Sequence, residues 1–210
     1  SLQLFIKQGD TALHWAAKND RAKTVELLLE KGAYVDAVNS DGFTALFLAA
    51  ENGHADIVTL LLAQGAEVNL PDSISGQTAL HLAAENGHTE IVALLIERFA
   101  DVNLFEFYGQ TALHFAAVNG HEEIVALLLD KGALDSPDSN GQTALHLAAS
   151  RGHEEIVRLL INNCSAAYYV NLPDFRSVKT ALHFAAVNGH EEIVALLLEK
   201  GAVDKADKQG

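Results

Sequence analysis

Apolar residues recur along the chain as pairs of short helical patterns, separated by polar segments that contain glycine. One such pair shows the features of all of them. Thr143 is a good helix N-cap, residues 144–149 supply small and apolar helix formers, and Gly152 can take the left-handed conformation that ends a helix. A second helix is predicted to begin at residues 153–155, where two carboxylates lie near its positive end. Its apolar residues, from Ile156 to Ile161, cover more than half of its circumference, so we expect this helix to be packed on more than one side.

The helix pairs are copies of one another. Each copy begins with Thr-Ala-Leu and continues with Ala-Ala, usually Asn-Gly-His, an Ile-Val and Leu-Leu run, and Gly-Ala. Residues 111–129 and 180–198 are identical over 19 positions, which indicates either recent duplication or consensus-style engineering. Isolated helices this short are marginal, so each copy must be stabilised by its neighbours, with alanine pairs such as Ala49 and Ala50 allowing close approach. The six copies begin at Thr11, Thr44, Thr78, Thr111, Thr143 and Thr180.

The repeated motif resembles that of ankyrin-repeat proteins, which have a period of about 33 residues and the signature T-P-L-H-x-A, here with Ala in place of Pro. The resemblance covers essentially the whole chain. It implies an all-α ankyrin-repeat solenoid, in which stacked helix-turn-helix units are joined by β-hairpin-like finger loops, and we expect one domain over residues 1–210. The expected repeats are 1–38, 39–71, 72–105, 106–137, 138–173 and 174–206, and residues 207–210 are expected to begin a seventh finger.

Composition and charge exclude several classes of protein. Of the 210 residues, 49% are hydrophobic and 20% are charged, as in a soluble globular protein. The formal net charge of −14 has the wrong sign for binding nucleic acid, and no apolar run approaches the roughly 18 to 20 residues of a membrane-spanning helix. Cys164 is the only cysteine, so it cannot form an internal disulfide. We expect a monomer in the cytoplasm, with the nucleus or delivery into a host cell as alternatives. The chain begins with Ser1 and has no Met, so we expect it to have been trimmed. Neither end shows an obvious polar cap, so we also expect it to be part of a longer array or protein.

Histidines are the most numerous candidates for chemistry, but they fall into two positions of the repeat. One set closes the Thr-Ala-Leu-His motif, and the resemblance implies that it forms hydrogen bonds between adjacent repeats. The other set opens the second helix, where His-Glu-Glu lacks the second histidine, four residues later, that a zinc-protease helix requires. No glycine-rich phosphate loop occurs, and Cys164 has no base placed beside it by the repeat. We therefore expect no catalysis, no cofactor and no metal. The two sets are His14, His81, His114, His146 and His183, and His54, His88, His121, His153 and His190.

Function is then expected to lie on surface positions that the repeat does not dictate. The resemblance implies that a protein partner binds the concave face, made of finger tips and the exposed side of the first helices. The fourth finger has three aromatic residues, Phe105, Phe107 and Tyr108, where polar turn residues are expected, and aromatic and Arg side chains most often dominate interfaces. The alternative is that these rings pack against adjoining fingers. Trp15 occupies a position held by Leu or Phe in other repeats, so we expect it in the core. The candidate contacts are Phe105, Phe107, Tyr108, Gln110, Phe43, Asp41, Ile74, Asn140, Arg151, Phe175, Arg176 and Lys179.

Departures from the repeat add one more candidate contact and two positions at which an expected glycine is replaced. An insertion at residues 164–169 is either a second contact with a partner or a tolerated loop. Phe99 and Val178 stand where glycine is expected.

The leading interpretation is a non-catalytic protein-protein interaction module. The alternatives are the targeting domain of a larger enzyme or of a secreted bacterial or parasite-type effector, and an engineered binding scaffold, against which the irregular segment 162–179 argues.

Overall fold

The computed structural model describes residues 9–163 and 167–206, and this part of the chain contains thirteen helices and no strand. The expected all-α architecture is confirmed. The helices are α1 (Ala12–Lys18), α2 (Ala22–Glu30), α3 (Ala45–Glu51), α4 (Ala55–Ala63), α5 (Ala79–Glu85), α6 (Thr89–Glu97), α7 (Ala112–Asn119), α8 (Glu122–Asp130), α9 (Ala144–Arg151), α10 (Glu154–Asn163), α11 (Ala167–Val170), α12 (Ala181–Val187) and α13 (Glu191–Glu199).

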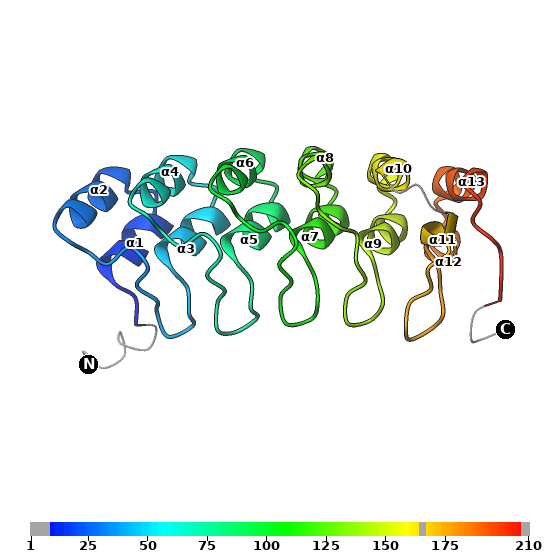
Figure 1. Cartoon of the computed structure of the whole chain (residues 1–210), viewed down its shortest axis with the longest axis horizontal. Coiled ribbons are helices and arrows are strands. Elements are labelled where there is room, and N and C mark those ends of the chain that lie inside the picture. The colour runs from blue at the N-terminus through cyan, green and yellow to red at the C-terminus, as the bar shows by residue number, and fades with distance from the viewer. Residues whose placement is uncertain (1–8, 164–166, 207–210) are drawn as a thin grey trace. The chain divides into compact units, whose positions relative to one another are not determined.

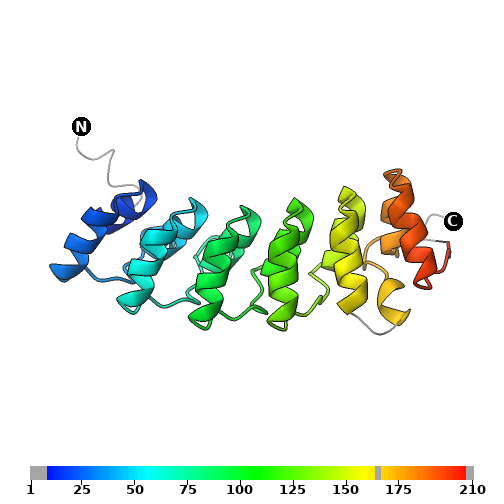
Figure 2. The same cartoon turned by 90° about the horizontal axis from the view of Figure 1, so that it is seen from above.

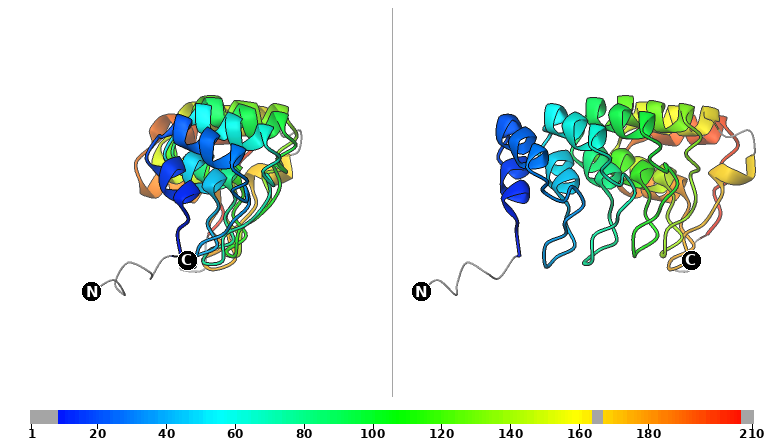
Figure 3. Two further views of the ribbon diagram at one scale, coloured as in Figure 1. Left: turned by 90° about the vertical axis from the view of Figure 1, so that its left-hand side faces the viewer. Right: turned by 60° about the vertical axis from the view of Figure 1, so that its left-hand side comes forward.

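The chain forms two compact units, Ser1–Phe107 and Tyr108–Gly210. Within the first unit, α1, α3 and α5 form one layer and α2, α4 and α6 form a second layer above it (Figure 1). Seen from above, the helices of that upper layer lie side by side (Figure 2). The second unit repeats this plan with the pairs α7–α8, α9–α10 and α12–α13, and adds the short helix α11 (Figure 1). In both units the loops between helix pairs extend away from the helices as fingers (Figure 3). The single domain expected over 1–210 stays a prediction.

Small residues let the first helices pack closely inside each unit. Ala49 and Ala50 of α3 are fully buried, as are Ala148 and Ala149 of α9. In the second layer, Val58 and Val157 hold the equivalent fully buried positions of α4 and α10. Each side chain is buried between neighbouring repeats, so the core runs along the stack and no single helix pair contains it.

The histidine that ends each Thr-Ala-Leu-His motif ties one repeat to the next. In α9, Nδ1 of His146 accepts a hydrogen bond from the backbone N–H of Thr143 at 3.1 Å. Its other ring nitrogen, Nε2, therefore carries the proton and donates to the carbonyl of Leu172 in the following finger, at 2.9 Å. The same pair of bonds recurs in both units, which confirms the structural role that the resemblance implies. The acceptors are the carbonyls of Phe43 for His14, Leu104 for His81, Gln142 for His114 and Lys205 for His183.

The His146 bond pattern makes the stability of the protein depend on pH. Burial lowers the pKa of His146, against the opposing effects of its bond to Leu172 and of the carboxylates of Asp135, Asp174 and Asp138. The unfolded chain, with a His pKa of about 6.5, therefore binds this proton more readily than the folded chain does. We expect the contribution of His146 to be complete above about pH 6.5 and to decline as the pH falls below it. Thermal melting from pH 8 to pH 5 checks this, with a shallower decline expected for His146→Gln, and equal slopes would contradict it.

Four histidines of the second set, His54, His88, His153 and His190, bond to carbonyls at the ends of first helices. His88 donates from Nε2 to the carbonyl of Glu51, at 3.2 Å, and so satisfies an acceptor in the last turn of α3. Its ring lies against Gly53, where an added Cβ would come within 2.7 Å of the ring. Gly53 also has φ +79°, so it needs glycine for both its conformation and its close contact. His153 and His190 repeat the arrangement in the second unit, on Gly120 and Gly152.

Phe99 and Val178 adopt the left-handed conformation of the glycines that they replace. Their φ values are +67° and +60°, against +82° at Gly65, the counterpart of Phe99 in the preceding repeat. The left-handed region costs a residue with a Cβ roughly 1–2 kcal/mol. The fold therefore imposes the conformation at these two sites even where the sequence does not favour it.

Phe99→Gly is expected to stabilise the protein by about 1 kcal/mol, because it removes the left-handed penalty and the ring is 87% exposed. The matched control is Gly65→Ala, which has open space around its Cβ and is expected to lose about 1 kcal/mol through φ alone. Urea midpoints measured by circular dichroism check both values. A lower midpoint for Phe99→Gly would show that the ring contributes more than the backbone conformation costs.

Trp15 corrects one expectation, because it is 54% exposed and does not lie in the core. Leu48 and Leu82, at the same position of their repeats, are buried. This position packs toward the preceding repeat, as the edge contact between Phe184 and His146 at 5.9 Å shows. Among the described residues no repeat precedes α1, so Trp15 has no such neighbour there.

The insertion after α10 is partly structural. Tyr169 is buried in α11, and its hydroxyl donates to the carboxylate of Asp135. Asp135 also accepts the backbone N–H groups of Ala144 and Leu145, and so caps the start of α9. Tyr169 therefore supports a helix terminus and does not point to solvent. Residues 164–166 of the proposed second contact, and the expected seventh finger at 207–210, lie outside the described residues.

Candidate functional site

In four fingers, the tip is fixed by a side chain that accepts backbone hydrogen bonds across the turn. In the fifth finger, Oδ1 of Asp138 accepts from the N–H groups of Asn140 and Gln142 at 2.8 and 2.9 Å. The backbone closes the same turn, because Asp138 N–H donates to the carbonyl of Gln142 at 2.8 Å. Turns held in this way present their tip residues in one conformation. Asn39, Asp72 and Asp174 hold the second, third and sixth fingers in the same manner.

Two of these carboxylates have shifted pKa values. Burial acts to raise the pKa of Asp72, but hydrogen bonds from Ser75, Ile74 and Gln77 outweigh it, and the net shift is downward. For Asp174, burial is likewise outweighed by hydrogen bonds from Ser177 and Lys179. Both groups are thus held as charged acceptors inside their own turns, which leaves them no role as acids or bases.

Adjacent fingers are joined within each unit. In the first unit, Ser73 N–H donates to the carbonyl of Asp41 at 2.9 Å, and Phe107 N–H donates to that of Ser75 at 2.8 Å. In the second unit, Ser139 donates to Tyr108 at 2.9 Å, and Phe175 donates to Asn140 at 2.7 Å. The fingers of a unit therefore form a connected row and are not independent loops.

Phe107 and Phe175 share one position of the repeat, the position at which other fingers carry serine, as at Ser73 and Ser139. Each ring lies on the tip glycine of the preceding finger. An added Cβ would come within 2.6 Å of Phe107 at Gly76 and within 2.5 Å of Phe175 at Gly141. The alternative of packing against an adjoining finger therefore holds in part for Phe107. The two side chains are nevertheless 66% and 64% exposed, so each ring is supported on one side and open on the other.

The other candidate contacts divide by exposure. Four of the candidate contacts besides Phe107 and Phe175 are hydrophobic or aromatic. Three of the polar candidates are half-buried at finger tips or in front of the Thr that begins each first helix, and a fourth, Asp41, is held by a backbone bond to the next finger. The exposed ones are Phe105, Tyr108, Ile74, Arg151 and Arg176, and the half-buried ones are Asp41, Gln110, Asn140, Lys179 and Phe43.

Phe43 has a packing role that was not predicted from the sequence. Its ring stacks on Phe47, with centroids 4.6 Å apart and the planes 7° from parallel. Phe47 stands where five other repeats have the histidine of the Thr-Ala-Leu-His motif, so this repeat replaces a hydrogen bond with a ring stack in a cluster that includes Leu48 and Leu82. The signal was present in the sequence, because Thr-Ala-Leu-Phe occurs once, directly after Phe43.

Nothing in the described ranges, 9–163 and 167–206, adds a chemical centre to this surface. No group of three or more His, Cys, Asp or Glu side chains in them is arranged to hold a metal ion. Within the same ranges, every helix is too short or too polar to cross a membrane. Within each unit, the connected fingers present side chains that are supported by neighbouring residues.

A comparison with protein families agrees with this architecture. A family model described as ankyrin repeats in three copies matches residues 2–72, 69–135 and 133–209. No curated protein matches the chain. Repeats of this kind are in general protein-protein interaction modules. Stacked helix pairs, fingers and a family match over nearly the whole length together show that the chain belongs to the ankyrin-repeat family.

Proposed function

We propose that this chain is a non-catalytic module that binds a partner protein through its finger tips and the adjoining face of its first helices. The observation that carries the proposal is the exposed phenylalanine at a serine position in each unit, Phe107 in the first and Phe175 in the second. The cytoplasmic location and the monomeric state stay predictions.

The support beneath these rings favours a binding role. An exposed aromatic ring on a mobile loop loses side-chain and loop freedom when a partner covers it, which subtracts from the affinity. Phe107 and Phe175 already rest on Gly76 and Gly141, and their backbones are bonded to the preceding finger. Binding a partner would therefore cost little further side-chain or loop freedom at these two residues.

The titratable groups argue against catalysis. The histidines that end the Thr-Ala-Leu-His motifs hold backbone groups through both ring nitrogens, and Asp72 and Asp174 hold their own turns. Groups engaged in this way cannot exchange protons with a substrate without loss of local structure.

Changing Phe107 and Phe175 together to serine is expected to abolish capture of the partner while leaving the fold intact. Serine is the residue that other fingers carry here, so the melting temperature should barely move. Aromatic hot spots each contribute about 2 kcal/mol or more, or about thirtyfold in affinity, so loss of two rings should reduce binding below detection. The measurement is affinity capture from lysate with each protein as bait, followed by mass spectrometry.

The matched control changes Tyr34 and Leu134 to serine, one exposed side chain in each unit away from the finger tips. We expect this control to capture the same proteins as the unchanged chain. Equal capture by the phenylalanine variant and the unchanged chain would place the binding surface elsewhere.

A further inference from the structure

The exposed charges of the second unit are separated by layer. We call its finger tips and first helices, residues 108–119, 138–151 and 174–188, the front face of the second unit. This face contains three cations and no exposed carboxylate. The cations are Arg151, Arg176 and Lys179, of which both arginines are exposed and the lysine is half-buried. In the described part of this unit, the exposed carboxylates lie on the second helices or after them, at Glu122, Glu123, Asp130, Glu154, Glu155, Glu191, Glu192, Glu199 and Asp204.

The two carboxylates that the front face does contain are buried. Asp138 and Asp174 are 4% and 6% exposed, and each accepts backbone hydrogen bonds from its own turn. Hydrogen bonds of this kind stabilise a charged carboxylate beneath the finger tip. The charge that reaches solvent on this face is therefore positive, in a chain whose net charge is −14.

The corresponding residues of the first unit have the opposite charge. Residues 9–19, 39–52 and 72–86 contain one cation, Lys18, and five carboxylates, four of which are half-buried and reach solvent. The half-buried ones are Asp10, Asp41, Glu51 and Glu85. The positive face is thus a property of the second unit and not of the repeat.

Arg151 departs most clearly from the other repeats. Five repeats have asparagine at this position, and each asparagine donates from Nδ2 to the carbonyl four residues earlier, as Asn119 does to Phe115 at 2.9 Å. This bond satisfies an acceptor in the last turn of the first helix. In the described ranges, the guanidinium of Arg151 forms neither that bond nor an ion pair, whereas Arg158 in the other layer pairs with Glu154. Arg151 therefore places an exposed charge where the fold uses a helix cap.

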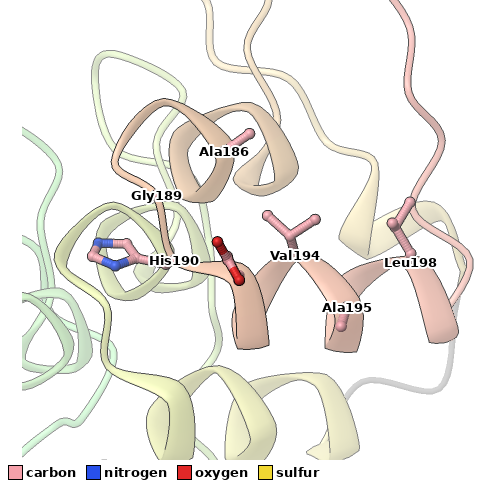
Figure 4. A pocket seen from close by; sticks show the side chains of 7 residues that line it. Ala186, Gly189, His190, Val194, Ala195 and Leu198 are labelled. Carbon is pink, nitrogen blue, oxygen red and sulfur yellow. The ribbon is translucent and has the colours of Figure 1, made fainter.

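The three cations are spread along the front face. At the finger tips, Phe175 N–H donates to the carbonyl of Asn140 at 2.7 Å. At the other end, Nε2 of His190, whose ring is shown in Figure 4, donates to the carbonyl of Ser150 at 3.2 Å. The residues that follow Phe175 and Ser150 are the two arginines, and Lys179 lies between them, just before α12. Since α9 alone is about 12 Å long at 1.5 Å per residue, a segment that contacts all three cations must extend along the face.

An exposed apolar side chain accompanies each arginine. Phe175, 64% exposed, directly precedes Arg176. Val187, 72% exposed, ends α12 and directly precedes Asn188, whose Nδ2 lies 3.5 Å from Oγ of Ser150, the neighbour of Arg151. A segment that fits both ends of the face therefore carries negative charge and apolar groups together.

We propose that the partner contacts the second unit through an acidic protein segment that also carries apolar side chains. Its carboxylates bind Arg151, Arg176 and Lys179, and its apolar groups pack on Phe175 and Val187. This inference rests on the binding function proposed above and specifies the chemistry of the partner. Arginine binds carboxylates through paired hydrogen bonds, and complementary charge speeds association and disfavours basic competitors. A nucleic acid is the less suitable polyanion, because its affinity depends on many phosphate contacts and the net charge of −14 opposes it.

Selection from a random peptide library displayed on phage, with the whole chain as bait, tests the proposal. We expect the selected peptides to be enriched in Asp and Glu together with aromatic or aliphatic residues. The double variant Arg151→Glu with Arg176→Glu is expected to select peptides enriched in Lys and Arg instead. The matched control, Lys131→Glu with Lys200→Glu, reverses two exposed cations away from the front face and should select the same acidic peptides as the unchanged chain.

A neutral variant then tests the contacts directly. Arg151→Asn with Lys179→Gln introduces residues that other repeats carry at these positions, so the melting temperature should hold. We expect this variant to bind the most enriched peptide about tenfold more weakly, measured by fluorescence anisotropy. Peptides without an excess of Asp and Glu, no enriched peptide, or an affinity that the neutral variant leaves unchanged would overturn the inference.

Two further measurements separate the possible failures. If the selected peptides are not acidic but lose affinity when Phe107 and Phe175 are changed to serine, the proposed binding site stands and only the inferred charge of the partner is wrong. If these serine changes also have no effect, both proposals fail. A labelled single-stranded DNA that binds more tightly than the selected peptide, and is released by Arg151→Glu with Arg176→Glu, would assign the cations to nucleic acid and overturn the inference.

Discussion

Ala117→Asp is expected to destabilise the second unit by about 3–5 kcal/mol, whereas Ala186→Asp is expected to change its stability by less than about 0.5 kcal/mol. Ala117 is fully buried where α7 meets α9, so an aspartate there would be an unpaired charge without water. Ala186 has the same sequence on both sides but is exposed. Urea denaturation followed by circular dichroism measures both variants.

Helix propensity and local sequence are the same at the two sites, so neither can cause a difference in stability between the two variants. Any difference between the two sites must come from the neighbouring repeat. Similar losses at both sites would mean that the α12–α13 face is covered in solution, and small losses at both would mean that α7 and α9 do not pack closely.

His146→Ala is expected to cost about 3 kcal/mol, the second largest effect. The change leaves the N–H of Thr143 and the carbonyl of Leu172 without their partner, removes the ring that Phe184 contacts, and opens a cavity at a nearly fully buried position. Each unsatisfied buried polar group costs roughly 1–3 kcal/mol. The free energy of unfolding from urea titration is the measurement.

His183→Ala is the matched control in the last repeat. His183 makes the same bonds, to Thr180 and to the carbonyl of Lys205, but it is half-buried, so water can replace it. We expect a loss of about 1 kcal/mol or less. A loss at His146 no greater than at His183 would show that the connection between repeats depends on apolar packing and not on these bonds.

The sequence was sufficient for the features that recur in every repeat. The Thr-Ala-Leu motif and the apolar run that follows it predicted both helices of each pair, and the resemblance to ankyrin repeats implied that His146 bonds to the adjacent repeat. Such features depend on local chain geometry and on a neighbour of the same kind, which the repetition itself supplies. They could therefore be inferred without coordinates.

Features that depend on a residue's place in the array were harder to predict. Trp15 was expected in the core because other repeats have Leu or Phe at its position, but burial there requires a preceding repeat. The contact between Tyr169 and Asp135 joins residues 34 apart through an insertion that no other repeat contains. For the candidate site, the sequence identified Phe107 and Phe175 separately, but not their shared position or the glycines beneath them. The shared position and the contacts with glycine depend on the register between adjacent fingers, which was not predicted from the sequence.

Photo-crosslinking from the finger tips tests the binding proposal most directly. A benzophenone side chain replaces Phe107 or Phe175 in one set of proteins and Tyr34 in a control, and each protein is irradiated in lysate. We expect one common partner to be joined through positions 107 and 175 and to be absent from position 34. Crosslinks of equal yield from all three positions, or none from the two finger tips, would contradict it.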